Sequence, residues 1–154
     1  MARRVILLVD DDARFAKLIK TFLLRGKEGT NEVVVARDGV EAIEYLFHPE
    51  RGPSEMPGLV LLDLNMPQMD GFGMLRKMRA AERTMFVPVV MLTSSVNPED
   101  VRSAYCLGAN GYLDKLSDRV PWNEMVQTVA RYWLGMSVTP NSLVGQGDGF
   151  ARRV

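Results

Sequence analysis

This 154-residue chain has one cysteine, one histidine and no formal net charge. The single cysteine, Cys106, cannot form an internal disulfide, so a reducing, cytoplasmic setting is expected. The 19 lysines and arginines balance the 19 aspartates and glutamates, and no local basic patch is evident, so a nucleic-acid partner is not expected.

Long apolar runs are also lacking. None approaches the roughly 20 residues that a membrane helix needs, so no membrane partner is expected. The start, Met1-Ala2-Arg3-Arg4 followed by five apolar residues, resembles a signal peptide only briefly, because Asp10, Asp11 and Asp12 end the apolar stretch early. The sequence therefore predicts a protein that is not exported.

Short apolar runs alternate with amphipathic stretches along the chain. The expected strands are residues 5–9, 32–36, 59–62, 87–92 and 111–113, and the expected helices are residues 13–24, 39–47, 72–80, 98–107 and 120–134. The first, third and fourth strands are continuously apolar, as in parallel strands covered on both faces. Five such strand–helix units predict an α/β protein with a doubly wound parallel sheet.

Acidic residues follow two of these strands. Asp63 directly follows residues 59–62, and Asp10, Asp11 and Asp12 follow residues 5–9. Open α/β sheets bind ligands at the carboxyl ends of their strands. Two carboxylates about 4 Å apart repel by roughly 4 kcal/mol at an effective dielectric near 20. The pattern therefore predicts a hard divalent cation with oxygen ligands, while Asp12 suits a cap of the first helix better than a ligand.

Across residues 4–134 the chain resembles the receiver domains of two-component response regulators. The resemblance rests on Asp10 and Asp11, on Asp63 with the following Met66-Pro67-x-Met69-Asp70-Gly71, and on Thr93 and Lys115 after the fourth and fifth strands. It implies a flavodoxin-like fold of five strands, in the order 2-1-3-4-5, with five helices. Residues 36–42, 105–112 and 133–140 are similar to stand-alone regulators that partner phytochromes.

The resemblance implies that Asp63 accepts a phosphoryl group from a histidine of a sensor kinase, with Mg²⁺ as cofactor. The metal would be held by Asp63, by Asp11 directly, by Asp10 through water and by the backbone carbonyl of Asn65. His48 reads as a surface residue at a helix end, so the phosphoryl donor is expected to be another protein, by similarity a phytochrome.

Three further roles follow from the same resemblance. Lys115 would pair with the phosphoryl group, and the hydroxyl of Thr93 would move to donate to it. Tyr112 would enter the space that Thr93 leaves, which is how such domains transmit the event. The protein is thus expected to be a phosphoacceptor that switches a protein-binding surface, not a dedicated enzyme.

One position departs from the family pattern. The family has a proline after the active-site lysine, joined to it by a cis peptide bond, but here Leu116 follows Lys115. A cis bond before a residue other than proline costs about 2.5–4 kcal/mol, against roughly 0.5–1 kcal/mol before proline. The sequence leaves both a cis and a trans Lys115–Leu116 bond open.

Residues 135–154 have too few apolar side chains for a core and are expected to form an extension, not an output domain. Val138, Leu143 and Val144 would otherwise hang in water, so this extension is predicted to act as an arm in a homodimer. The family resemblance favours a dimer that pairs through surfaces near the last two helices.

Two other functions remain open from the sequence. A phosphatase of the haloacid-dehalogenase type also uses an aspartyl phosphate after a parallel strand, but it needs a second aspartate two residues later, where this chain has Asn65. A receiver acting as a scaffold without phosphate would not need the complete set of acids, threonine and lysine.

Overall fold

A computed structural model describes residues 5–26 and 32–143 of the chain. Five parallel strands form one sheet in the order β2-β1-β3-β4-β5. The strands are β1 (Val5–Val9), β2 (Glu32–Ala36), β3 (Leu59–Leu62), β4 (Val89–Thr93) and β5 (Gly111–Asp114). The predicted doubly wound sheet and its strand order are confirmed.

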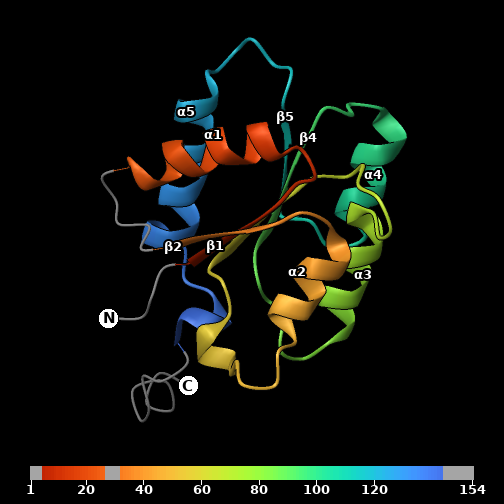
Figure 1. Cartoon of the computed structure of the whole chain (residues 1–154), viewed down its shortest axis with the longest axis vertical. Coiled ribbons are helices and arrows are strands. Elements are labelled where there is room, and N and C mark those ends of the chain that lie inside the picture. The colour runs from red at the N-terminus through yellow and green to blue at the C-terminus, as the bar shows by residue number, and fades with distance from the viewer. Residues whose placement is uncertain (1–4, 27–31, 144–154) are drawn as a thin grey trace.

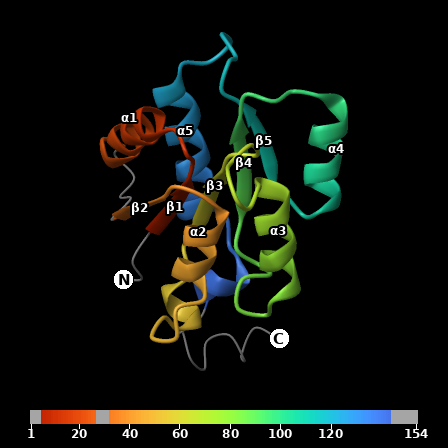
Figure 2. The ribbon, with the colours of Figure 1, turned by 45° about the vertical axis from the view of Figure 1, so that its right-hand side comes forward.

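Five α-helices cover the two faces of this sheet (Figures 1 and 2). They are α1 (Ala13–Leu24), α2 (Gly39–Leu46), α3 (Gly71–Ala80), α4 (Pro98–Cys106) and α5 (Trp122–Ala130). In Figure 2 α1 and α5 lie on one side of the sheet, and α2, α3 and α4 lie on the other. Among the described residues, no helix is long and apolar enough to cross a membrane.

The alternation of side chains along each strand builds two cores. Leu7 and Val9 of β1 join the core under α2, α3 and α4, whereas Ile6 and Leu8 join the core under α1 and α5. All of these side chains are almost fully buried. Continuous apolar runs are therefore needed here, because both faces of the sheet exclude water.

Two elements differ from the prediction by more than one residue at an end. Strand β4 begins at Val89 and not at residue 87, since Pro88 has no N–H for the ladder. The last helix was predicted over residues 120–134, but α5 begins at Trp122, after Pro121, and ends at Ala130. The chain then continues as a π-helical segment, η2 (Arg131–Met136).

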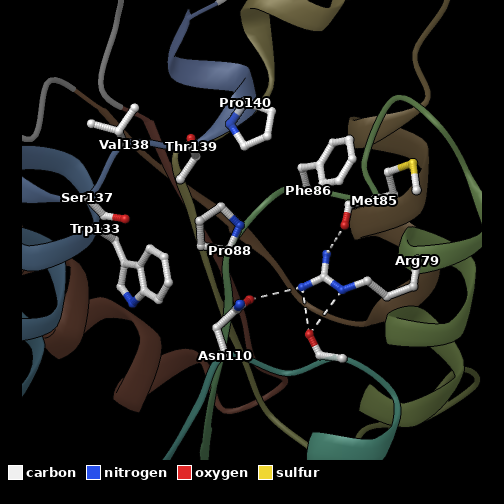
Figure 3. A pocket seen from close by; sticks show the side chains of 11 residues that line it. Arg79, Met85, Phe86, Pro88, Asn110, Trp133, Ser137, Val138, Thr139 and Pro140 are labelled. Carbon is white, nitrogen blue, oxygen red and sulfur yellow. Dashed lines mark hydrogen bonds between the residues drawn. The ribbon is translucent and has the colours of Figure 1, made fainter. Parts of the chain in front are cut away.

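Part of the predicted C-terminal extension folds back on the domain. A 3₁₀ turn, η3 (Pro140–Leu143), lies against another, η1 (Pro53–Glu55), at the edge of the sheet where the strands begin. Val138, Thr139 and Pro140 line a cavity of about 260 Å³ there, together with Trp133 and other residues (Figure 3). Val144, which was predicted to belong to the arm, lies outside the described residues with the rest of the chain end.

Arg79, near the end of α3, lies at the same edge of the sheet (Figure 3). Its guanidinium donates to the Gly108 carbonyl from Nε and Nη2, at 3.0 and 2.9 Å, and from Nη2 to Asn110 Oδ1 at 3.0 Å. Nη1 donates to the carbonyls of Thr84, Met85 and Val87 at 3.3, 3.0 and 2.8 Å. One side chain therefore links α3 to the segments that lead into β4 and β5.

Candidate phosphoacceptor site

The strand order brings the acids after β1 and β3 together. The Asp63 N–H donates to the Val9 carbonyl at 3.0 Å, so Asp63 lies beside the end of β1, where Asp10 and Asp11 begin the next loop. One carboxylate oxygen from each of Asp10, Asp11 and Asp63 lies within 4.8 Å of the others. The sequence-based expectation of clustered carboxylates at this edge is met.

The three carboxylates differ in exposure. Asp10 and Asp63 are buried, at 1% and 6% exposed, while Asp11 is exposed. Asp10 accepts from the Asp12 N–H at 2.9 Å, and Asp63 accepts from the Leu64 N–H at 2.8 Å. These bonds involve Oδ1 of each buried carboxylate, and Oδ2 of each faces the ammonium of Lys115.

Lys115 supplies one positive charge to the cluster. Its Nζ lies 2.7 Å from Asp10 Oδ2 and 3.2 Å from Asp63 Oδ2, and its side chain is only 12% exposed. Burial alone would lower the pKa of Lys115, but its hydrogen bond with Asp10 and the charges of Asp10 and Asp63 outweigh burial and raise that pKa. Lys115 is therefore protonated at neutral pH.

The pKa of Asp10 is also raised, but here burial is the cause. Burial raises the pKa of Asp10 above its usual 3.8, against the opposing effects of the Lys115 and Asp12 hydrogen bonds. One ammonium facing three carboxylates leaves a surplus of negative charge in a partly dry site. Oxygen ligands with surplus negative charge suit a hard divalent cation, so the residues present fit such an ion.

The hydroxyl groups that the sequence singled out lie around the loop after β4. Thr93 is fully buried, and its Oγ1 accepts from the Ser95 N–H at 3.4 Å. Tyr112 of β5 donates its hydroxyl proton to the Ser95 carbonyl at 2.7 Å, and Ser95 Oγ donates to Asp100 at 2.6 Å. Burial raises the pKa of Tyr112, so its hydroxyl remains a donor. Thr93 and Tyr112 thus hold the same loop.

The loop after β3 explains the Asp70-Gly71 pair. Asp70 caps α3 by accepting from the Gly73 N–H at 2.8 Å, and Asp12 likewise caps α1. A Cβ on Gly71 would lie 2.5 Å from the Asp63 carbonyl oxygen, so only glycine fits this close approach. Asn65 is exposed two residues after Asp63, and the expected role of its backbone carbonyl stays a prediction.

The Lys115–Leu116 peptide bond, left open by the sequence, is trans, since the described residues contain no cis bond. Two contacts of Lys115 were not foreseen. Its Nζ lies 4.3 Å from the centre of the Phe15 ring, and its carbonyl accepts from Trp122 Nε1 at 2.7 Å. The sequence analysis assigned neither Phe15 nor Trp122 a role at this site.

A comparison with the sequence models of known protein families gives a match. The family described as the response regulator receiver domain matches residues 6–127. The chain belongs to this family. A receiver-domain response regulator is a component of two-component signalling, and the match gives no support to the haloacid-dehalogenase alternative.

Two relatives match this receiver domain over most of their length. It is 38% identical to the probable methanogenesis regulatory protein FilR2 of Methanothrix harundinacea over 88% of this chain and 87% of the relative. It is 35% identical to response regulator Rcp1 of Synechocystis sp. over 89% of this chain and 93% of Rcp1.

Two solved structures resemble the receiver domain closely. The phosphorylated cyanobacterial phytochrome response regulator RcpA superposes with a TM-score of 0.80 at 31% identity, covering 90% of this chain and 99% of RcpA. The Mn²⁺-bound form of Rcp1 superposes with a TM-score of 0.76 at 34% identity, covering 89% of this chain and 99% of Rcp1.

Proposed function

We propose that Asp63 accepts a phosphoryl group from a phosphohistidine of a sensor kinase. A carboxylate oxygen of Asp63 forms a bond to phosphorus while the bond from phosphorus to the histidine nitrogen breaks, and that nitrogen keeps the electron pair. The observation that carries the proposal is the convergence of Asp63, Asp10, Asp11 and Lys115 at one edge of the sheet.

Mg²⁺ is the proposed cofactor, which would be held directly by the carboxylates of Asp11 and Asp63 and by the backbone carbonyl of Asn65, and through water by Asp10. When bound, it reduces the repulsion between Asp63 and the anionic donor and stabilises charge on the transferring group. The surplus negative charge of the cluster supports this assignment, as does the Mn²⁺ found in the Rcp1 structure.

Lys115 is proposed to meet the incoming phosphoryl oxygens. Its ammonium already contacts Asp63, the acceptor, so a phosphoryl group on Asp63 comes within reach without a large movement of the chain. A buried ammonium stabilises developing negative charge more strongly than one in water. Lys115 therefore acts on the reacting group, while its contact with Asp10 keeps it in place before transfer.

The output is proposed to start at Thr93. A phosphoryl oxygen attracts the Thr93 hydroxyl, which now accepts from the Ser95 N–H, and the loop of residues 93–95 follows. Tyr112 is bonded to the Ser95 carbonyl, so movement of this loop changes the position of the Tyr112 ring. The affected surface lies over α4 and β5 and binds the next protein.

The proposed kinase is a phytochrome, because RcpA, to which this chain is similar, is a phytochrome response regulator. We further propose a receiver domain over residues 4–134, an extension over 135–154 and a cytoplasmic location. The proposed output is protein binding, and no nucleic-acid partner is proposed.

Incubation with acetyl phosphate and Mg²⁺, followed by intact mass measurement, tests the phosphoacceptor function. We expect a gain of the mass of one phosphoryl group, because Asp63 is the single proposed acceptor and the Lys115 ammonium lies beside it. A protein that stays unmodified, or that instead turns over unrelated phosphoesters rapidly, would overturn the proposal.

A homodimer is the second expected result. The exposed apolar side chains near the chain end include Tyr132, Met136 and Val138, at 49%, 58% and 74% exposed, and a two-fold pair is the commonest way to cover such a surface. Sedimentation at micromolar concentration should be compared for the full chain, a chain ending at Leu143 and a chain ending at Gly135. Loss of the dimer only in the shortest chain assigns the contact to residues 136–143. Monomers throughout would disprove pairing.

A further inference from the structure

The backbone around Lys115 is held from both sides although no proline follows it. On one side the Lys115 N–H donates to the Thr93 carbonyl at 2.9 Å, which continues the β4–β5 ladder. On the other side the Lys115 carbonyl accepts from Trp122 Nε1 at 2.7 Å. Leu116 itself is 74% exposed, so the residue in place of the proline adds little to this hold.

The indole of Trp122 also reaches the Lys115 side chain through Phe15. The rings of Phe15 and Trp122 pack edge to face, with centroids 4.9 Å apart and planes at 89°. The Phe15 ring lies under the Lys115 ammonium at 4.3 Å. The three residues form a closed set of contacts, in which one aromatic ring holds the backbone of Lys115 and the other holds its charged end.

We infer that Trp122 and Phe15 are positioning residues for Lys115, and that they do here what a proline after the lysine does elsewhere. Lysine has a flexible four-carbon stem and a strongly hydrated ammonium, so without support it exchanges its protein contacts for water. An aromatic face beneath the ammonium and a fixed carbonyl behind it reduce the number of positions that Nζ can take. Asp10 and Asp63 then select the position used in transfer.

This inference rests on the proposed function, since Lys115 matters only if a phosphoryl group arrives at Asp63. It differs from a purely structural reading of Trp122, in which the indole fills space at the start of α5. In the structural reading, removing the N–H costs stability and leaves the order of Lys115 Nζ unchanged. In the positioning reading, the Lys115 ammonium loosens while the fold persists.

The decisive variant is Trp122→Phe, which keeps an aromatic ring against Phe15 and removes the N–H that reaches the Lys115 carbonyl. We expect the initial rate of labelling by acetyl phosphate at saturating Mg²⁺ to fall by about three- to tenfold, as for loss of a group that orients a reacting side chain. The matched control is Trp133→Phe, the same change at the other tryptophan, which lines the cavity at the opposite edge of the sheet.

The second measurement reports on Lys115 itself. The ¹⁵N shift and the order of its Nζ are read by NMR through the non-exchanging Cε protons, with Lys115→Met for assignment. We expect Trp122→Phe to move the shift toward that of a solvated lysine and to lower the order, and Trp133→Phe to do neither. Phe15→Leu, which removes the ring under the ammonium, provides a second test in the same direction should Trp122→Phe fail to fold.

The outcomes are distinct. A lower labelling rate in Trp122→Phe, together with a lower order of Lys115 Nζ, supports the inference. An unchanged labelling rate in Trp122→Phe, or a slower rate with Lys115 unchanged, overturns it, because the indole would then act without Lys115. A wild-type protein that takes no phosphoryl group is a failure of the proposed function, and it is distinguishable because it appears before any variant is compared.

Discussion

Replacing Asp63 with asparagine is expected to abolish labelling by acetyl phosphate and by a cognate kinase, a loss of more than about a hundredfold. The amide has the size of the carboxylate and keeps an oxygen to accept from the Leu64 N–H, but it is not a nucleophile toward phosphorus. Since the change also removes one of three clustered negative charges, the variant should fold at least as stably as the wild type without metal.

The matched control for this variant is Asp70→Asn. Asp70 lies in the same loop and caps α3, and asparagine caps helices as well as aspartate does. This control loses the same charge from the loop and should still take one phosphoryl group. Full labelling of Asp63→Asn would mean that another residue is the acceptor, and intact mass with peptide mapping would locate it.

Mg²⁺ is expected to raise the melting temperature of the protein by about 3–6 °C at tenfold over its dissociation constant. Binding to the folded state alone contributes roughly 1.4 kcal/mol at that ratio, and about 2–4 °C accompanies each kcal/mol in a domain of this size. Asp11→Asn should remove most of this increment, because Asp11 supplies one of the three clustered carboxylates.

The control here is Asp12→Asn, which removes an adjacent charge but keeps the cap that accepts from the Arg14 and Phe15 N–H groups at 3.1 Å. It should respond to Mg²⁺ as the wild type does.

The rise in melting temperature that Mg²⁺ causes should also become smaller on acidification. Asp10 has a pKa above 3.8 in the folded state, so protons compete with the metal for it as the pH falls through that raised pKa. A melting temperature indifferent to millimolar Mg²⁺ would contradict the metal site.

Patterns in the sequence were sufficient to predict the parallel sheet and the convergence of Asp10, Asp11 and Asp63. These depend on short-range patterns: an apolar run followed by an acid identifies a strand end, and parallel strands put such ends at one edge. The family resemblance contributed the strand order and the expected roles of Thr93 and Lys115.

The sequence was not sufficient for the surroundings of Lys115. The bond from Trp122 to the Lys115 carbonyl depends on the path of the loop between them, and the contact of Lys115 with Phe15 joins residues that are far apart in the sequence. No periodicity encodes either contact. The early start predicted for β4 and the late end predicted for α5 were wrong because apolar residues continue past both elements, while Pro88 and the π-helical turn limit them.

The Arg79 network described above has a consequence for where the molecule can move. Its acceptors are backbone carbonyls and one amide, which carry no charge that pH, metal or phosphate could change. The Arg79 hydrogen bonds should therefore stay the same when pH, metal or phosphate changes at the acidic edge. If Asp63 is phosphorylated as proposed, the resulting motion is expected in the loops at the carboxyl ends of the strands and not at the edge that Arg79 links together.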